Sequence, residues 1–204
     1  MSSRTSTDEI RERYARVREE VGEATTVVVA TKYLSVAELA LLADAGVEVV
    51  GENRAQDLAA KHDVYGDAFR WHFIGHLQSR KAKTVNELCE LCHSLDSESA
   101  ARKLEIPALV EVNLSGEPTK SGVAPGELGA FIALYPDVRG LMTMPPWAED
   151  PEASRPYFVR LRELAEEHSL PELSMGTSQD YRVAAQEGAT FVRVGSTIFG
   201  DRRT

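Results

Sequence analysis

A single lysine follows a buried-strand pattern near the start of the chain. The run 27–31 is mostly β-branched and apolar, and Lys32 comes directly after it. Such a run is typical of a strand covered on both faces in a parallel sheet, a class that binds its ligands at the carboxyl ends of the strands. An amine held there against apolar walls loses hydration and gives up its proton more readily. An amine of this kind can attack a carbonyl and form a Schiff base. The alternative, which this segment alone favours, is a solvated lysine in a loop.

Two loops rich in glycine and hydroxyl groups predict a phosphate site late in the chain. One reads G-T-S at 176–178 and the other reads G-S-T at 195–197. Backbone N–H groups and hydroxyls in such loops bind phosphate, often after the seventh and eighth strands of a barrel. Closure of a barrel puts the last strand beside the first. A phosphate held at Ser178 and Gly195 would therefore lie next to Lys32.

A Schiff-base lysine beside a phosphate suggests pyridoxal 5′-phosphate (PLP), whose aldehyde and phosphate sit on neighbouring arms of one ring. Arg193 lies two residues before Gly195 and can face the ring nitrogen, which proteins pair with Asp or Arg. Arginine keeps its proton, so the ring nitrogen would stay unprotonated and the ring would be a poorer electron sink. The alternative for Arg193 is a charge at the barrel rim, although an arginine inside an apolar strand needs a partner.

Composition favours one soluble domain that binds a small ligand. The chain has 204 residues, 43% hydrophobic and 27% charged, with a formal net charge of −9. A charge of this sign disfavours nucleic acid and anionic membrane surfaces as partners. The first twenty residues are dense in Arg and Glu, without the apolar core of a secretory signal, and no later run is long enough to span a membrane. We expect a cytoplasmic protein.

The two cysteines, Cys89 and Cys92, precede His93 in the pattern C-x-x-C-H. This pattern is also the attachment signature of c-type haem, and its first four residues have a redox or half-zinc spacing. Haem attachment normally belongs to exported chains, and zinc would need two further ligands. The alternation of the cysteines with Leu88 and Leu91 favours small buried hydrophobic residues instead.

The chain repeats a strand-then-helix unit eight times after an amphipathic helix at 7–21. The predicted strands are 27–31, 47–50, 70–74, 91–95, 108–112, 138–142, 173–175 and 191–194. Strict alternation with short links predicts parallel strands with right-handed crossovers. Eight such strands most simply close into a (β/α)8 TIM barrel, here a single domain over 1–204, with an extra N-terminal helix in 1–24 and the barrel in 25–204.

The alternative to a barrel is an open doubly wound sheet. No G-x-G-x-x-G follows any predicted strand, which argues against a dinucleotide site. The G-x-x-x-x-G at 195–200 lacks the Lys and Ser/Thr of a phosphate-binding P-loop.

Seven short motifs resemble those of the pyridoxal phosphate homeostasis proteins, one-domain relatives of the alanine racemase N-terminal barrel. They are V-V-A-T-K-Y (28–33), G-E-N-R-A-Q (51–56), W-H-F-I-G-H-L-Q (71–78), E-V-N-L-S (111–115), K-S-G (120–122), G-L-M-T-M-P (140–145) and V-R-V-G-S-T-I-F-G (192–200). The resemblance implies PLP bound covalently to Lys32 and Arg193 against the ring nitrogen. It assigns the phosphate to Ser178 and to the loop of Gly195, Ser196 and Thr197, and the pocket walls to Asn53, His72 and Met142.

Two residues depart from the pattern of that family. Thr177 stands where Met is usual, and Arg80 stands where Asn is frequent. The first could alter packing beside the phosphate. The second could alter an anion site near Lys81 and Lys83, although a solvated helix face is the simpler interpretation.

The resemblance implies a cofactor carrier and buffer more than an enzyme. Alanine racemase needs a second acid-base group supplied with a second domain, and the sequence ends at Thr204, shortly after the eighth strand. We therefore expect a monomer that binds PLP and hands it to apo-enzymes. The alternatives are a weak PLP-dependent racemase or lyase, with His72, His76 or Tyr33 as second base, and a Schiff-base aldolase acting on a phosphorylated sugar.

Overall fold

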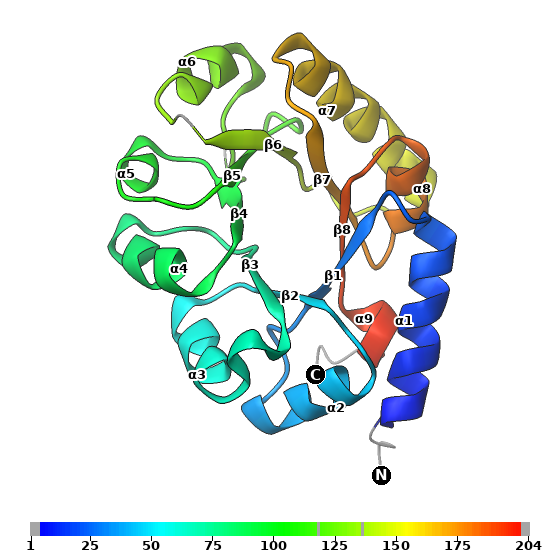
Figure 1. The fold of residues 1–204 in the computed structure, drawn as a ribbon. Coiled ribbons are helices and arrows are strands. Elements are labelled where there is room, and N and C mark those ends of the chain that lie inside the picture. The colour runs from blue at the N-terminus through cyan, green and yellow to red at the C-terminus, as the bar shows by residue number, and fades with distance from the viewer. Residues whose placement is uncertain (1–4, 118, 136, 201–204) are drawn as a thin grey trace.

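The structure is a closed barrel of eight parallel strands. It is a computed structural model that describes residues 5–117, 119–135 and 137–200. Each strand pairs with the next one along the chain, and the last pairs with the first, with Val28 beside Arg193. The strands are Thr26–Ala30 (β1), Val49–Glu52 (β2), Arg70–Phe73 (β3), Leu91–Leu95 (β4), Ala108–Glu111 (β5), Val138–Met142 (β6), Glu172–Thr177 (β7) and Phe191–Val194 (β8). This arrangement confirms the predicted (β/α)8 barrel (Figure 1).

Helices form a ring outside the strands. They are Thr7–Val21 (α1), Leu39–Asp44 (α2), Ala55–Tyr65 (α3), Ala82–Leu88 (α4), Glu98–Ala101 (α5), Leu128–Ile132 (α6), Arg155–Glu167 (α7), Tyr181–Gln186 (α8) and Ser196–Phe199 (α9). Short 3-10 helices span Val36–Glu38, Gly66–Ala68, Ser79–Lys81, Pro125–Glu127 and Pro151–Ser154. None of the helices in the described ranges is long and apolar enough to cross a membrane.

Helix α1 has the predicted bounds and confirms the expected N-terminal helix. It begins with a capping box in which the Ser6 hydroxyl accepts from the backbone of Glu9 and the Glu9 carboxylate accepts from the backbone of Ser6. It lies between α8 and α2, outside β8 and β1 (Figure 1). Within the described residues only the four-residue α9 follows β8. Helix α1 therefore covers the outer side of the barrel where the last strand meets the first.

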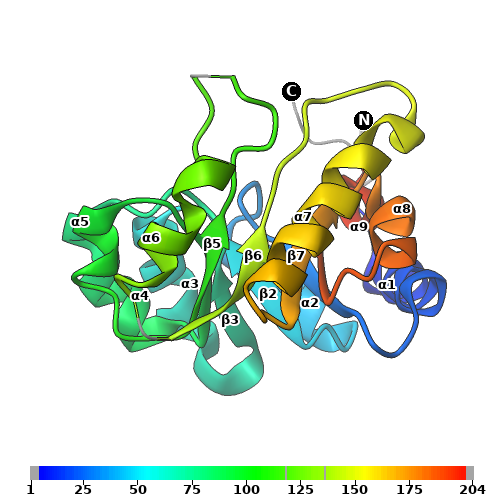
Figure 2. The same ribbon diagram turned by 90° about the horizontal axis from the view of Figure 1, so that it is seen from above.

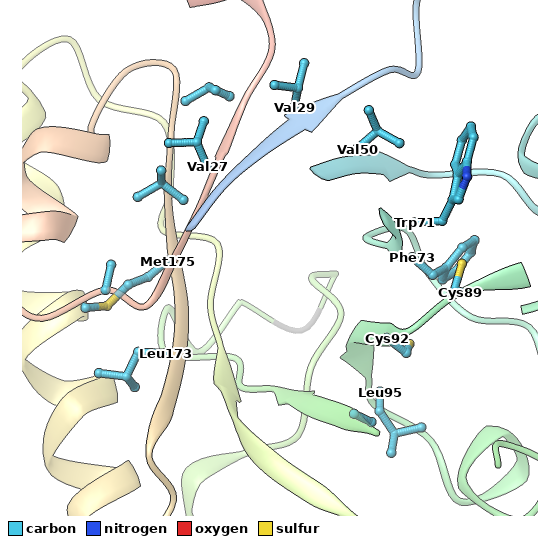
Figure 3. Packing of buried hydrophobic residues seen from close by; sticks show 14 of the residues in the cluster. Val27, Val29, Val50, Trp71, Phe73, Cys89, Cys92, Leu95, Leu173 and Met175 are labelled. Carbon is cyan, nitrogen blue, oxygen red and sulfur yellow. The ribbon is translucent and has the colours of Figure 1, made fainter. Parts of the chain in front are cut away.

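Side chains alternate along the strands between the outer helices and the barrel interior. Figure 3 shows Val27 and Val29 on the outer side of β1, and Leu173 and Met175 on the outer side of β7. Because successive side chains of a strand point to opposite faces, Val28 and Ser174 face the interior. The outward-facing apolar side chains pack the strands against the helices, so the inward-facing side chains can be polar.

The second strand lies two residues later than predicted. Its apolar run fits either position. In the structure Val49 pairs with Val28, whereas Val47 lies in the turn after α2, where its backbone N–H donates to the carbonyl of Leu42. This shift brings Glu52 into β2, where it is fully buried.

Candidate cofactor-binding site

A cavity of about 560 Å³ opens at the carboxyl ends of the strands. Six of the residues predicted for the site line it, namely Lys32, Asn53, Ser178, Arg193, Gly195 and Ser196. They come from the loops or ends of β1, β2, β7 and β8, which barrel closure brings together. Figure 2 shows the loops after β5 and β6 rising from one end of the barrel, and the second of them adds Met144 and Trp147 to the wall.

Lys32 lies at the mouth of this cavity, one residue after Thr31. Its side chain is exposed, and its Nζ lies 4.8 Å from the centroid of the Tyr33 ring. An ammonium over an aromatic face is stabilised by the charge distribution of the ring. Lys32 is therefore solvated and not held against apolar walls, and the Tyr33 ring that it contacts is itself 55% exposed. The amine is accessible to a ligand that enters the cavity.

The β7 and β8 loops meet at the hydroxyl of Ser178. Its oxygen accepts from the backbone N–H groups of Gly195 (2.9 Å) and Thr197 (3.2 Å). The Thr197 hydroxyl donates back to the carbonyl of Ser178, 3.2 Å away. No described residue accepts the hydroxyl proton of Ser178, so this group can donate to an anionic oxygen in the cavity. Thr197 therefore stabilises the loop through Ser178 and is not among the residues that line the cavity.

The two departures from the family pattern lie in different surroundings. Asp180 accepts from the backbone N–H of Thr177 (2.7 Å) and from its hydroxyl (3.1 Å), so Thr177 stabilises the turn that carries Ser178. Arg80 is exposed, and its Nε donates to the Gln78 side chain, 3.1 Å away. The surroundings of Arg80 fit a solvated surface.

Arg193 is the buried cation of the site. It is 6% exposed and donates to the Thr143 carbonyl (3.1 Å), the Met144 sulfur (3.1 Å) and the Ser174 hydroxyl. Burial lowers the pKa of Arg193 to about 10, an effect that the negative charges of Glu111 and Asp180 oppose. The guanidinium therefore remains charged at neutral pH, held at the inner wall of the cavity.

A chain of hydrogen bonds runs from Arg193 into the barrel. His93 Nδ1 lies 2.7 Å from the Ser174 hydroxyl oxygen, and His93 Nε2 lies 2.9 Å from His72 Nδ1. Arginine can only donate, so Ser174 accepts from Arg193. Burial lowers the pKa of His72 to about 3 and that of His93 well below its usual value, so both imidazoles are neutral at neutral pH. Each neutral ring carries one proton, which makes one of its nitrogens a donor and the other an acceptor.

Two predicted wall residues lie below the cavity instead of lining it. His72 is 1% exposed and belongs to the chain of hydrogen bonds. Met142 is 2% exposed and packs in a small interior cluster with Leu91 and Leu109. His72 lies within β3 and Met142 is the last residue of β6, and both are covered by the residues around them. Met144, two residues later, takes the expected place of Met142 in the wall.

Asn53 is held at the cavity wall by a close backbone contact. A Cβ added at Gly75 would lie 2.1 Å from the Asn53 carbonyl oxygen, so only glycine fits there. The side-chain oxygen of Asn53 is buried without a hydrogen-bond partner in the described structure. A buried polar atom of this kind favours a ligand that donates a hydrogen bond to it.

A buried ion pair lies behind Lys32, and sequence reasoning missed it. The Lys61 ammonium donates to the Glu52 carboxylate (2.5 Å) and to the carbonyl of Thr31 (2.8 Å). Glu52 also accepts from the Thr31 hydroxyl (2.8 Å) and from the backbone of Asn53 (2.7 Å). The pair thus connects the residues that precede Lys32 and Asn53. In the sequence, the signal for this pair is that Lys61 follows Glu52 by nine residues, which places it on the inner face of the helix after that strand.

The cysteines are free and buried, as the alternation with leucine predicted. Burial raises the pKa of Cys92 to about 11 and raises that of Cys89 further, so neither is a reactive thiolate at neutral pH. His93 of the same motif is fully buried, and its two ring nitrogens lie within hydrogen-bond distance of Ser174 and His72.

Comparison with known proteins defines the class of this barrel. The family model for the alanine racemase N-terminal domain matches residues 5–203. The alanine racemase of Corynebacterium glutamicum has a TM-score of 0.74 at 15% identity, covering 98% of this chain and 63% of that protein, which is a likeness of fold alone.

Closer relatives define the family. The pyridoxal phosphate homeostasis protein of Aquifex aeolicus is 44% identical over 179 residues, or 78% of each chain. That of Schizosaccharomyces pombe is 34% identical over 205 residues, covering 90% of this chain and 86% of the relative. A structure of PipY from Synechococcus elongatus with PLP bound has a TM-score of 0.82 at 31% identity, covering 94% of this chain and all of PipY. The chain belongs to the pyridoxal phosphate homeostasis protein family.

Proposed function

We propose that this protein binds PLP through a Schiff base on Lys32 and acts as a carrier and buffer of the cofactor. The observation that supports this most is one cavity that contains an accessible amine, a hydroxyl and N–H loop for phosphate, and a buried guanidinium. Bound PLP supplies an aldehyde that condenses with a primary amine. The PLP-bound structure of PipY supports the choice of ligand.

The residues around the cavity fit the parts of the cofactor. Lys32 holds the aldehyde carbon, and Ser178 with the backbone of Gly195 and Ser196 binds the phosphate. Arg193 donates to the ring nitrogen, which keeps that nitrogen unprotonated, and the side-chain oxygen of Asn53 accepts a hydrogen bond from the ligand.

An open mouth and the lack of a well-placed second base favour a carrier over an enzyme. Met144 is 50% exposed and Trp147 is 77% exposed, so water reaches the cavity and weakens its electrostatic interactions. The Tyr33 ring lies against the Lys32 amine itself. His76 is more than half exposed and faces Asp96 at 3.3 Å, and His72 is buried below the cavity.

A carrier of this kind limits the free aldehyde and passes the cofactor to apo-enzymes. In our proposal it acts as a cytoplasmic monomer, and the exposed mouth is where an acceptor receives PLP. The formal net charge of −9 favours such small-molecule and protein contacts over nucleic acid.

The visible absorption spectrum of the purified protein with added PLP tests the proposal. We expect a yellow Schiff-base band that is absent in Lys32→Ala, with matching thermal unfolding of the two proteins because Lys32 is exposed. Lys32→Arg is the matched control, since it keeps the charge and cannot form the link at neutral pH. A band of equal strength in Lys32→Ala would reject Lys32 as the site.

Incubation of the PLP-loaded protein with single L-amino acids separates a carrier from an enzyme. A carrier forms D-isomer or keto acid no faster than free PLP does at the same concentration. Turnover well above that of free PLP, lost in Lys32→Ala, would instead support a racemase or lyase.

A further inference from the structure

Helix α1 contacts both helices that follow the phosphate-binding loops. Helix α8 begins three residues after Ser178, and α9 begins at Ser196. In Figure 1, α1 runs beside both of them along the outer edge of the barrel. We propose that α1 positions the phosphate-binding loops, through Arg13 and Thr5 on α9 and through Glu20 on α8, and so sets the affinity for the 5′-phosphate of the ligand. The inference rests on the proposed function.

Two side chains hold α9, one from the first half of α1 and one from the residues that precede this helix. Arg13 Nη1 donates to the Ile198 carbonyl, and the Thr5 hydroxyl donates to the Phe199 carbonyl, both at 3.1 Å. A four-residue helix is too short to satisfy the carbonyls of its last turn with its own N–H groups. Arg13 and Thr5 supply these partners from a different element. Both ends of α9 contribute to the cavity, since Ser196 at its start and Phe199 at its end are among the residues that line it.

A carboxylate from the last turn of α1 holds α8. Glu20 Oε1 accepts from Arg182 at 2.7 Å, and Glu20 Oε2 accepts from the Tyr181 hydroxyl. Tyr181 and Arg182 are the first two residues of α8. Because Asp180 bonds back to Thr177, a shift of α8 would move the turn that carries Ser178.

Helix α1 is itself firmly fixed, as a support must be. Its inner face is apolar, and it buries four side chains against the barrel, Ile10, Tyr14, Val17 and Val21. Burial of these four side chains stabilises the contact between the helix and the barrel. The polar contacts to α8 and α9 therefore originate from a rigid element and not from a mobile terminus.

The two contacts act on one structural feature. The Ser178 hydroxyl accepts from the N–H groups of Gly195 and Thr197, so the distance between the β7 and β8 loops decides where this hydroxyl directs its own proton in the cavity. From outside the barrel, α1 fixes the helices after both loops. Loss of Arg13 should loosen α9 and reduce the contribution of the phosphate to binding, while the Lys32 end of the cavity is unchanged.

The test compares PLP with pyridoxal, which has the aldehyde but no phosphate. Dissociation constants for both are measured from the Schiff-base band in the unmodified protein, Arg13→Gln, Glu20→Gln and Arg18→Gln. Arg18 is the matched control, because it lies on the same helix but pairs with Glu48 at 3.2 Å, away from both loops. We expect the affinity of Arg13→Gln for PLP to fall about three- to tenfold, the equivalent of one or two hydrogen bonds. Its affinity for pyridoxal should change less than about twofold, and Glu20→Gln should behave in the same way.

The outcomes separate this inference from the proposed function. If the unmodified protein forms no Schiff base with PLP, the proposed function is wrong, and the inference with it. If the unmodified protein binds PLP but Arg13→Gln and Glu20→Gln match Arg18→Gln, the inference alone is wrong. Equal losses for PLP and pyridoxal in Arg13→Gln would also contradict it, because a general loss of stability does not distinguish the two ligands.

Discussion

The imidazole Nδ1 of His93 lies 2.7 Å from the hydroxyl oxygen of Ser174 in the interior of the barrel. Ser174 is also an acceptor for Arg193, so this contact connects the cation of the cavity to two buried histidines. Arginine can only donate, so the bond from Arg193 to Ser174 has a fixed direction, and burial keeps both histidines neutral at neutral pH. The guanidinium is therefore connected through Ser174 to two uncharged rings.

The buried histidines make stability fall in acid. The unfolded chain protonates a histidine near pH 6.5, whereas the folded protein keeps His72 neutral down to its pKa of about 3. Between these values the unfolded state binds more protons, so the free energy of unfolding falls as pH falls from 6.5 towards 3. His72→Gln keeps an acceptor for His93 and removes one titrating group. We expect the free energy of unfolding of this variant to change less steeply with pH, by up to about 1.4 kcal/mol per pH unit. Urea unfolding from pH 4 to 7.5 measures both slopes, and equal slopes would contradict the assignment.

Removal of one partner of the ion pair behind Lys32 should destabilise the folded protein far more than removal of both. Lys61→Met leaves the buried Glu52 carboxylate without its cation, which typically costs about 3–5 kcal/mol. The double variant Glu52→Gln and Lys61→Met removes both charges and should recover much of that loss. Urea unfolding of the three proteins gives these values. A double variant that is less stable than Lys61→Met would show that the charges are not coupled as described.

Gly75 should tolerate no side chain. Gly75→Ala places a methyl group against the Asn53 carbonyl, and we expect a loss of about 1–3 kcal/mol in the free energy of unfolding, with weaker PLP binding as Asn53 moves from the wall. Gly126→Ala is the control, since a Cβ there meets nothing within 4 Å, and it should change stability by less than about 0.5 kcal/mol. Similar results for the two variants would rule out the close contact.

Thr177 should be replaceable by the methionine usual in the family at a modest cost. Thr177→Met keeps the backbone bond to Asp180 and loses the hydroxyl bond, worth about 0.5–1.5 kcal/mol. We expect the affinity for PLP, followed by the Schiff-base band, to change by less than about threefold, because Ser178 keeps its donors. Thr177→Ser is the matched control and should retain stability. A loss of binding in Thr177→Met that Thr177→Ser does not share would mean that the hydroxyl contacts the phosphate directly.

The barrel was predictable because its signals are local and repeated. Eight apolar runs with helices between them specify parallel strands, and closure follows from their number. The place of α1 was not predictable in the same way. Its sequence shows an amphipathic helix, but only the fold shows that the described chain leaves the outer ring open between β8 and β1.

The residues at the mouth of the site could be predicted from the ends of the strands, whereas the buried residues that hold them in place could not. Lys32, Ser178 and Arg193 were located because a barrel brings such residues together at one end. His93 and Ser174 lie at inward positions within strands, where period-2 alternation gives the direction of a side chain but not its partner. Lys61 pairs with Glu52 only because β2 is two residues later than its apolar run suggested.

Borohydride reduction of the PLP-loaded protein, followed by peptide mass mapping, tests the central claim most directly. Reduction converts a Schiff base into a stable secondary amine on the lysine that formed it. We predict one predominant pyridoxyl adduct, on Lys32, from protein that has the yellow band before reduction. An adduct spread over exposed lysines such as Lys83, or absent from Lys32, would contradict the proposal that the cavity holds PLP through this amine.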